Sequence, residues 1–238
     1  MSTVAVAIIC KTPISGTSKT RLSPPLRPDE CAAISACFIR DLSKTVQSLA
    51  ADGDVTGYAV YTPRGSEASL KRLLPQEFRL LPQIDGDFGE RLLQAAIDLF
   101  QPGHTGALLL NSDSPTLPKA ILRQAVDAVR RGDNVVLSPA FDGGYTLIGL
   151  SKPHARLFAE IPWSTSEVYE STLDRAREVG VPVVNVSGWY DVDDATSLRM
   201  LEAELSGEHP PFAAMDLIGA EAPATRQFMR ARQTAPVT

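Results

Sequence analysis

Residues 4–22 read VAVAIICKTPISGTSKTRL, an uninterrupted apolar run followed by a loop with three basic residues and a glycine. The run over residues 4–10 is rich in β-branched and apolar side chains without polar alternation, which predicts a central strand covered on both faces. A loop that follows such a strand leaves the carboxyl edge of an open α/β sheet, where ligands bind. The stretch therefore predicts a ligand site at the end of the first strand.

The charges of this loop indicate what it binds. Lys11, Lys19 and Arg21 could neutralise a diphosphate, and Gly16 would let backbone amides approach the phosphates closely. The loop is neither a Walker loop, because GxxxxGK[ST] is absent, nor a GxGxxG dinucleotide fingerprint. An ordinary solvated loop with basic residues is the alternative interpretation.

Composition excludes some classes of function. The chain has 238 residues, of which 44% are hydrophobic and 21% charged, as in a globular protein of one large α/β domain or two small ones. A formal net charge of −5 argues against a general nucleic-acid binder, which would normally carry a basic excess. No signal peptide and no membrane-spanning run is expected, so the chain is predicted to be cytoplasmic, without nucleic-acid or membrane partners.

The three cysteines, Cys10, Cys31 and Cys37, form no CxxC and no Cys/His spacing that would suit a metal. An odd number of cysteines also leaves one unpaired in any disulfide scheme. We therefore expect buried thiols in a reducing compartment.

Apolar runs alternate with amphipathic stretches along the chain. This alternation implies right-handed crossovers and a mostly parallel sheet with helices on both faces. Residues 1–206 are thus predicted to form one α/β domain, a three-layer sandwich with a mostly parallel mixed sheet. Residues 207–238, where Pro, Ala and Glu replace the periodic pattern, are expected to be a partly ordered tail. Strands are expected over residues 4–10, 55–61, 78–81, 106–110, 134–137, 146–150 and 181–186, and helices over 28–49, 66–74, 118–131 and 164–180, with two more ending near residues 100 and 205.

Acidic residues recur where predicted strands end, and the carboxyl ends of parallel strands meet at one edge. Mg²⁺ or Mn²⁺ prefers oxygen ligands, typically one or two carboxylates with phosphate oxygens and water. Asp113, together with Asp193 or with Asp191 in its place, could hold such an ion against a nucleotide diphosphate. Each aspartate could instead be a cap or turn residue, which is the role expected for Asp194.

Residues 141–145, FDGGY, predict a hairpin, because Asp-Gly lies between two strand-like runs. The tip of that hairpin could present Asp142 and the backbone amides of Gly143 and Gly144 to an acceptor. Trp163, beside a predicted helix start, suits a core residue or a stacking wall equally well.

These elements together resemble a family of bacterial nucleotide-diphospho-sugar transferase-like proteins with the glycosyltransferase-A fold. Members of that family are often labelled radical-SAM/selenodomain-associated or arsenosugar-type glycosyltransferases. The Lys-Thr-Arg-Leu and Asp-Gly-Gly elements also resemble 2-phospholactate-type guanylyltransferases, which share the fold. The matching pieces, in family order over roughly residues 4–205, are residues 11–13 with Gly16, 19–22 (KTRL), 86–91 (GDFGER), 112–117 (SDSPTL), 138–139 with 142–145 (DGGY), 163–164 (WS) and 191–193 (DVD).

The resemblance implies a nucleotide-binding sheet with Mg²⁺ or Mn²⁺ at an Asp-containing turn. In the fold's glycosyltransferases that turn is commonly Asp-x-Asp, whereas residues 112–114 here hold one carboxylate, so Asp193 or Asp191 would have to supply the second. The residues predicted to contact the nucleotide and its phosphates are Lys11, Gly16, Lys19, Arg21, Arg91, Ser112, Gly143 and Gly144.

Three functions remain open from the sequence. The leading hypothesis is transfer of a glycosyl group from a nucleoside-diphosphate sugar to a small acceptor, with Lys19 and Arg21 on the phosphates and Asp142 as the base. The second is nucleotidyl transfer, of guanylyl or cytidylyl type, to a small phosphorylated acid. Three basic groups are generous for a diphosphate, which favours this second function. The third is a non-catalytic nucleotide-binding module, favoured by the lone aspartate at 112–114. A homodimer is also left open.

Overall fold

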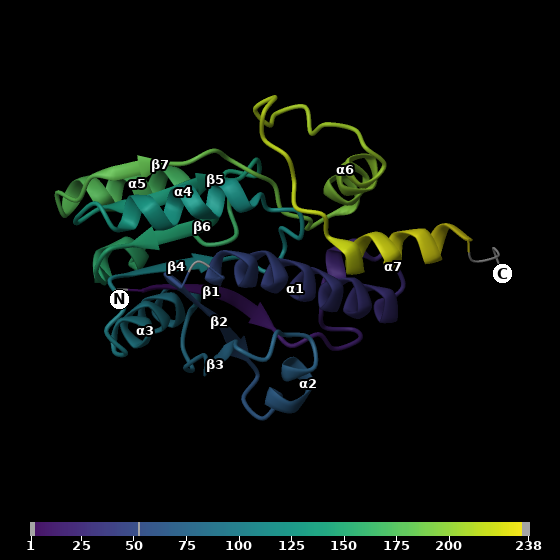
Figure 1. Cartoon of the computed structure of the whole chain (residues 1–238), viewed down its shortest axis with the longest axis horizontal. Helices are drawn as coiled ribbons and strands as arrows, with labels where there is room; N and C mark the ends of the chain where they lie inside the picture. The colour runs from purple at the N-terminus through teal and green to yellow at the C-terminus, as the bar shows by residue number, and fades with distance from the viewer. Residues whose placement is uncertain (1–2, 52, 235–238) are drawn as a thin grey trace.

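A seven-stranded sheet in the order β3-β2-β1-β4-β6-β5-β7 is the middle layer of the structure (Figure 1). The computed structural model describes residues 3–51 and 53–234. Every predicted strand is confirmed, with ends that differ by at most two residues. The strands are β1 Val4–Lys11, β2 Val55–Thr62, β3 Arg79–Pro82, β4 Gly106–Leu110, β5 Val135–Pro139, β6 Tyr145–Leu150 and β7 Val183–Asn185.

β6 pairs antiparallel with both β4 and β5, and the other neighbouring strands pair in parallel. The sheet is therefore mixed and mostly parallel, as predicted. Because β6 runs backwards, the hairpin that joins it to β5 lies at the edge where β1 and β4 end. This topology brings the hairpin to the predicted ligand edge.

Helices cover both faces of the sheet (Figure 1). Side chains of β1 alternate between the two cores: Val4, Val6 and Ile8 pack in the one with α1 and α4, and Ala5 and Ala7 in the one with α3 and α5. All five are fully buried, which explains the absence of polar alternation in this run. The helices are α1 Pro28–Ala50, α2 Glu67–Lys71, α3 Phe88–Phe100, α4 Lys119–Val129, α5 Val168–Glu178, α6 Ala195–Leu205 and α7 Pro223–Thr234, with short 3-10 turns η1 Thr20–Leu22 and η2 Ala155–Phe158.

One helix begins later than predicted. The pattern placed its start at residue 164, but α5 begins at Val168. Ser164 has φ 65, in the left-handed region, which a helix interior does not accept. Residues 163–167 therefore form a loop at the ligand edge.

Two properties predicted from composition can be compared with the structure. Cys10 and Cys31 are buried free thiols, and Cys37 is a half-buried free thiol. Within residues 3–51 and 53–234, no helix is both long and apolar enough to cross a bilayer.

The C-terminal segment contains a helix that the sequence pattern did not predict. α7 packs against α1, with Met229 buried in the core. Its start is held by Asp41, a buried carboxylate of α1, which accepts hydrogen bonds from the backbone N–H groups of Ala224 (3.0 Å) and Thr225 (2.7 Å). A carboxylate at a helix N-terminus satisfies N–H groups that lack partners within the helix. Asp41 and Ala224 are 183 residues apart in the sequence, so the periodicity of the sequence could not reveal this contact.

Replacing Asp41 with alanine should therefore loosen α7. Two N–H groups, a buried one and a partly buried one, lose their acceptor, so we expect the free energy of unfolding to fall by about 1–3 kcal/mol. Urea unfolding would measure the loss, and limited proteolysis should cut the variant near residue 223 first. Asp85→Ala, at an exposed loop position, is the matched control. Wild-type stability in Asp41→Ala would contradict this role.

Candidate active site

Four loops meet at the carboxyl edge of the sheet. The backbone N–H of Val192, after β7, donates to the carbonyl of Asp113, after β4, at 2.9 Å. The loop after β1 reaches both, because the Lys19 ammonium donates to the Val192 carbonyl at 2.7 Å. The β5–β6 hairpin adds Asp142 nearby. The predicted convergence of these loops is therefore present in the structure.

The loop after β1 is folded by local contacts. Gly16 has φ +78, and the Ser18 hydroxyl accepts from the N–H of Ile14 at 2.9 Å, so residues 14–18 form a tight turn. Leu22 and Leu26 are buried in the α1-side core and anchor its far end. The basic residues between these anchors are held close to the sheet edge.

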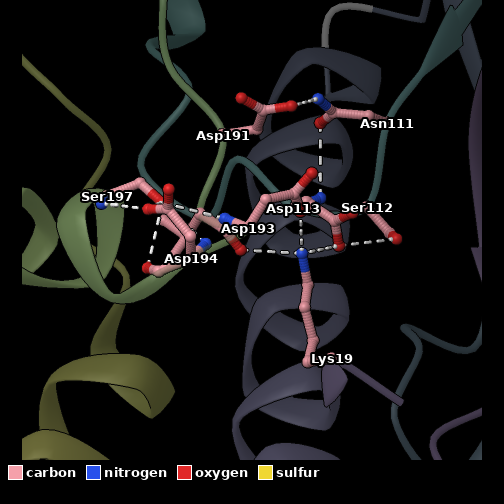
Figure 2. A network of polar contacts seen from close by, with 9 residues as sticks. Lys19, Asn111, Ser112, Asp113, Asp191, Asp193, Asp194 and Ser197 are labelled. Carbon is pink, nitrogen blue, oxygen red and sulfur yellow. Dashed lines mark hydrogen bonds and ion pairs between the residues drawn. The ribbon is translucent and has the colours of Figure 1, made fainter. Parts of the chain in front are cut away.

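Lys19 lies between two of the predicted metal-binding carboxylates. Figure 2 shows its ammonium facing Asp113 Oδ1 at 2.8 Å and Asp193 Oδ1 at 2.7 Å. With the Val192 carbonyl, these oxygens occupy all three donors of the ammonium. The lysine side chain is only 8% exposed, so this contact is shielded from solvent. It ties together three loops from distant parts of the chain.

The backbone and the charge of Lys19 fit this position. Its φ of 50 is left-handed, a conformation that costs a non-glycine residue energy and marks constrained sites. Burial alone would lower the pKa of Lys19, but Asp113 and then Asp193 outweigh it and raise the pKa. The lysine is therefore a permanent cation.

A polar shell orients the carboxylates. Ser112 Oγ donates to Asp113 Oδ1 at 3.1 Å, and Asn111 Nδ2 donates to Asp191 Oδ2 at 3.5 Å (Figure 2). The N–H of Asp193 donates to Ser197 Oγ at 2.9 Å. These bonds fix each acid relative to β4 or α6.

Asp194 has the structural role that was predicted for it. Its Oδ1 accepts from the N–H groups of Thr196 (2.9 Å) and Ser197 (2.8 Å), which makes it the N-cap of α6. Asp191 and Asp193, which precede this N-cap, therefore lie outside α6, in the loop at the edge of the sheet.

Asp191 is the acid whose ionisation is most disturbed. Burial and, after it, the nearby charges of Asp142, Asp193 and Asp113 together raise its pKa to about 7. A carboxyl group with such a pKa can hold or release a proton near neutral pH.

Two cavities of about 330 Å³ each open at this edge and share Ser112, Asp113, Ser164 and Asp193. One of them, which we call the basic cavity, is lined by Lys11, Lys19 and Arg21, the three cations predicted to bind phosphate. We call the other the acidic cavity, because Asp142 and Asp191 line it together with the shared Asp113 and Asp193. The acidic cavity lies beside it, toward β6. The remaining residues of the basic cavity are Lys11, Thr17, Ser18, Lys19, Thr20, Arg21 and Ser35, and those of the acidic cavity are Ile9, Phe88, Leu92, Leu109, Leu110, Asn111, Asp142, Gly144, Tyr145, Thr146, Ile148, Trp163, Thr165, Val168 and Asp191.

The β5–β6 hairpin is formed as predicted. Asp142 Oδ1 accepts from the N–H of Gly144 at 2.9 Å, and both residues line the acidic cavity. Gly143 does not line it. A Cβ on Gly143 would lie 2.1 Å from the Ser166 carbonyl oxygen, so this glycine serves close packing against the loop before α5.

Two other predicted contacts lie outside both cavities. Gly16 shapes the turn before Lys19. Arg91 donates to Gln83 Oε1 at 3.0 Å and stacks on the ring of Phe88 at 5.4 Å. Phe88 in turn meets Trp163 edge-on at 5.0 Å, and both rings line the acidic cavity.

Sequence reasoning did not single out Gln83 or Phe88. Gln83 is buried, and its Nε2 donates to the Val60 carbonyl at 3.0 Å and to that of Cys10 at 3.4 Å. A buried polar residue directly after a short strand was the available signal, because such a group requires partners.

The residues that would hold a divalent ion can be tested for fit. Two carboxylate oxygens, from Asp113 and Asp193, converge on one point, as Mg²⁺ requires. In the structure that point is taken by the ammonium of Lys19. Across residues 3–51 and 53–234, no group of three or more His, Cys, Asp or Glu side chains is arranged to hold a metal ion by itself. The donor set therefore fits an ion with phosphate and water ligands, provided that Lys19 moves aside.

Replacing Lys19 with methionine should destabilise the site while keeping the length of the side chain. Asp113 and Asp193 would then face each other without a cation, and we expect the free energy of unfolding to fall by about 1–3 kcal/mol, since both acids are partly solvated. Urea unfolding measures the loss. The double variant Lys19→Met/Asp193→Asn should recover part of it, and Lys44→Met, at an exposed position of α1, is the control. An unchanged midpoint in Lys19→Met would contradict the pairing.

The raised pKa of Asp191 predicts a pH dependence of stability in buffer free of divalent metal. The folded pKa of about 7 exceeds the unfolded value of about 3.9, so the folded state binds more protons between these values. The free energy of unfolding contributed by this group therefore falls as pH rises from about 4 to 7. Asp191→Asn, which mimics the protonated acid, should gain roughly 1–3 kcal/mol over wild type by pH 8 and little at pH 4. Parallel pH profiles of the two proteins would contradict the shift.

Comparison with known proteins gives relatives over most of the chain. The chain is 29% identical over 206 residues to 2-phospho-L-lactate guanylyltransferase of Methanothermobacter thermautotrophicus, an alignment that covers 81% of this chain and 82% of the relative. The similarity to guanylyltransferases indicated by the sequence motifs is thus confirmed.

Solved structures agree on the fold. A protein of Desulfovibrio desulfuricans, provisionally named a nucleotide-diphospho-sugar transferase, superposes with a TM-score of 0.82 at 26% identity over 98% of this chain and 96% of that one. CMP:2-keto-3-deoxy-manno-octonic acid synthetase, solved with CTP, gives a TM-score of 0.57 at 12% identity over 87% and 100% of the two chains, a likeness of fold alone.

A family model describes the central part of the chain. It matches residues 45–165, about half of the sequence, from the end of α1 to the loop before α5. The chain belongs to the family described as "Uncharacterized protein conserved in bacteria (DUF2064)".

Proposed function

We propose that the protein is a nucleotidyltransferase, which binds a nucleoside triphosphate in the basic cavity and transfers the nucleoside monophosphate to a small acceptor. The observation that carries this proposal is that Lys11, Lys19 and Arg21 line one cavity. Three cations match a triphosphate better than a diphosphate. The relationship to a guanylyltransferase at 29% identity supports the same choice.

The reaction needs a nucleophile, a stabilised leaving group and a place for a proton. The acceptor's oxygen attacks the α-phosphorus, a new P–O bond forms, and the bond to the bridging oxygen breaks, so that pyrophosphate leaves with the electron pair. Lys11 and Arg21 would neutralise the leaving group. Asp142, which lines the acidic cavity, would take the proton of the acceptor's hydroxyl.

Lys19 shares its two carboxylate partners, Asp113 and Asp193, with the proposed divalent ion. Asp113 and Asp193 would hold Mg²⁺ or Mn²⁺ when it is present, and such an ion neutralises charge on phosphate oxygens. Since the ammonium shares the oxygens of both acids, ion binding would free Lys19 to turn toward the phosphates in the basic cavity.

A second function is favoured by one observation. The Desulfovibrio protein with the TM-score of 0.82 is named for nucleotide-diphospho-sugars. With such a donor the same residues would transfer a glycosyl group, and a nucleoside diphosphate would leave.

A nucleotide screen separates the two functions. Thermal shifts with nucleoside triphosphates and with sugar nucleotides, each with and without Mg²⁺ or Mn²⁺, report the preferred donor, because a ligand stabilises the folded state that it binds. We expect larger shifts with a triphosphate and pyrophosphate release on turnover. Stabilisation by a sugar nucleotide alone, with release of nucleoside diphosphate, would favour glycosyl transfer.

Removing charge from the basic cavity should weaken nucleotide binding without unfolding the protein. Lys11 and Arg21 are both exposed, so Lys11→Ala and Arg21→Ala should leave the melting temperature of the free protein nearly unchanged. Each should raise the Kd for the triphosphate about tenfold or more, since a charge-assisted hydrogen bond contributes roughly 1.5–3 kcal/mol. Isothermal titration calorimetry measures this, with Lys44→Ala as the control. Wild-type affinity in both variants would sink the assignment of the basic cavity.

A further inference from the structure

We propose that the acidic cavity selects an acceptor that is uncharged or cationic and carries a hydroxyl or amino nucleophile, and that it excludes phosphorylated acids. The inference rests on the proposed function, because it assigns this cavity to the acceptor of the transfer. It is carried by the charge and polarity of the cavity wall.

The wall contains acids and no bases. Among the described residues, Asp113, Asp142, Asp191 and Asp193 line the cavity, and no lysine, arginine or histidine does. Lys19 lines the basic cavity, and its three N–H donors are already bound to Asp113, Asp193 and the Val192 carbonyl. A phosphorylated acid carries two or more negative charges and would find no side-chain cation here.

Nearby cations do not remove the negative charge of the acidic cavity. Arg91 lies against Phe88, but its guanidinium donates to Gln83 Oε1 and lies outside the lining. A divalent ion on Asp113 and Asp193 would neutralise those two acids and leave Asp142 and Asp191 facing the cavity. The cavity therefore keeps a negative potential with or without that ion.

Much of the remaining wall is apolar. Ile9, Leu92, Leu109 and Ile148 all belong to the core on the α3 and α5 face of the sheet, and the rings of Phe88 and Trp163 meet edge-on at 5.0 Å. Such a wall suits the carbon skeleton of a small ligand. It also lowers the local dielectric, which strengthens repulsion between the carboxylates and an anion.

The cavity's position fits the acceptor. Residues of the hairpin and of the 163–168 segment line it on the β6 side, whereas the cations assigned to the triphosphate lie at the end of β1 and in the loop that follows. The two cavities meet at four shared residues, so ligands in both would be adjacent. A hydroxyl or amino nucleophile must lose its proton as the new bond to phosphorus forms, and Asp142 is placed to take it. A phosphate nucleophile would need cations instead.

Collisional quenching tests the charge of the cavity directly. The chain has two tryptophans, and Trp189 is fully buried, so accessible emission comes from Trp163 in the cavity wall. Relative to N-acetyltryptophanamide, caesium should quench at least about twofold more than iodide, with neutral acrylamide between them, in both the absence and the presence of Mg²⁺. Asp142→Asn should narrow the difference, and Asp174→Asn, an exposed acid of α5, should not. Trp163→Phe identifies the signal. Iodide that quenches as well as caesium would overturn the proposal.

Three probes with a three-carbon skeleton test the ligand class: glycerol, 2-amino-1,3-propanediol and 3-phosphoglycerate. In the presence of a nucleoside triphosphate and Mg²⁺, the first two should protect Trp163 from acrylamide and speed pyrophosphate release, and phosphoglycerate should do neither. Tighter protection by phosphoglycerate, or no protection by the other two, would overturn the inference while triphosphate binding still upheld the proposed function. Absence of triphosphate binding would defeat the proposed function, and the quenching ratio would still report the charge of the cavity.

Discussion

The ion pair of Lys19 with Asp113 and Asp193 is the interaction on which the functional edge of this protein depends. Three loops, which follow β1, β4 and β7, bring backbone and carboxylate groups to one ammonium. Without a cation, Asp113 and Asp193 would repel each other, because both lie within 2.8 Å of the same point, and their partial burial would add a desolvation cost. A single cation, itself only 8% exposed, offsets both effects. The carboxylates can therefore be concentrated at a sheet edge before any ligand arrives.

This arrangement explains how one edge can hold two opposite environments. The ammonium binds Asp113 and Asp193, which line both cavities, while Lys11 and Arg21 line one cavity and Asp142 and Asp191 line the other. Because charges are weakly screened in a low-dielectric environment, the ammonium lowers the negative charge of Asp113 and Asp193, the two acids that line both cavities. The left-handed backbone of the lysine shows that the loop is held in an otherwise unfavourable conformation to provide it.

Much of the fold could be predicted from the sequence because its signals are local. The apolar run of β1 shows burial on both faces, and the Asp-Gly pair marks the hairpin. Predicting that acids at strand ends converge required only the rule that parallel strands end at one edge. The antiparallel β6 preserves that rule, because its hairpin lies at the same edge.

What could not be predicted depends on long-range contacts. Lys19 and Asp193 are separated by 174 residues, and nothing in the loop's composition shows that its lysine would pair with acids rather than with phosphate. The docking of α7 through Asp41 is hidden in the same way. The division of the edge into a basic and an acidic cavity follows from that one pairing. A sequence reading that assigns every cation to phosphate and every acid to metal overlooks the possibility that the two neutralise each other. In the described part of the chain, Lys11 and Arg21 line the basic cavity and no lysine, arginine or histidine lines the acidic one, and this asymmetry would give the proposed donor and acceptor chemically different binding sites.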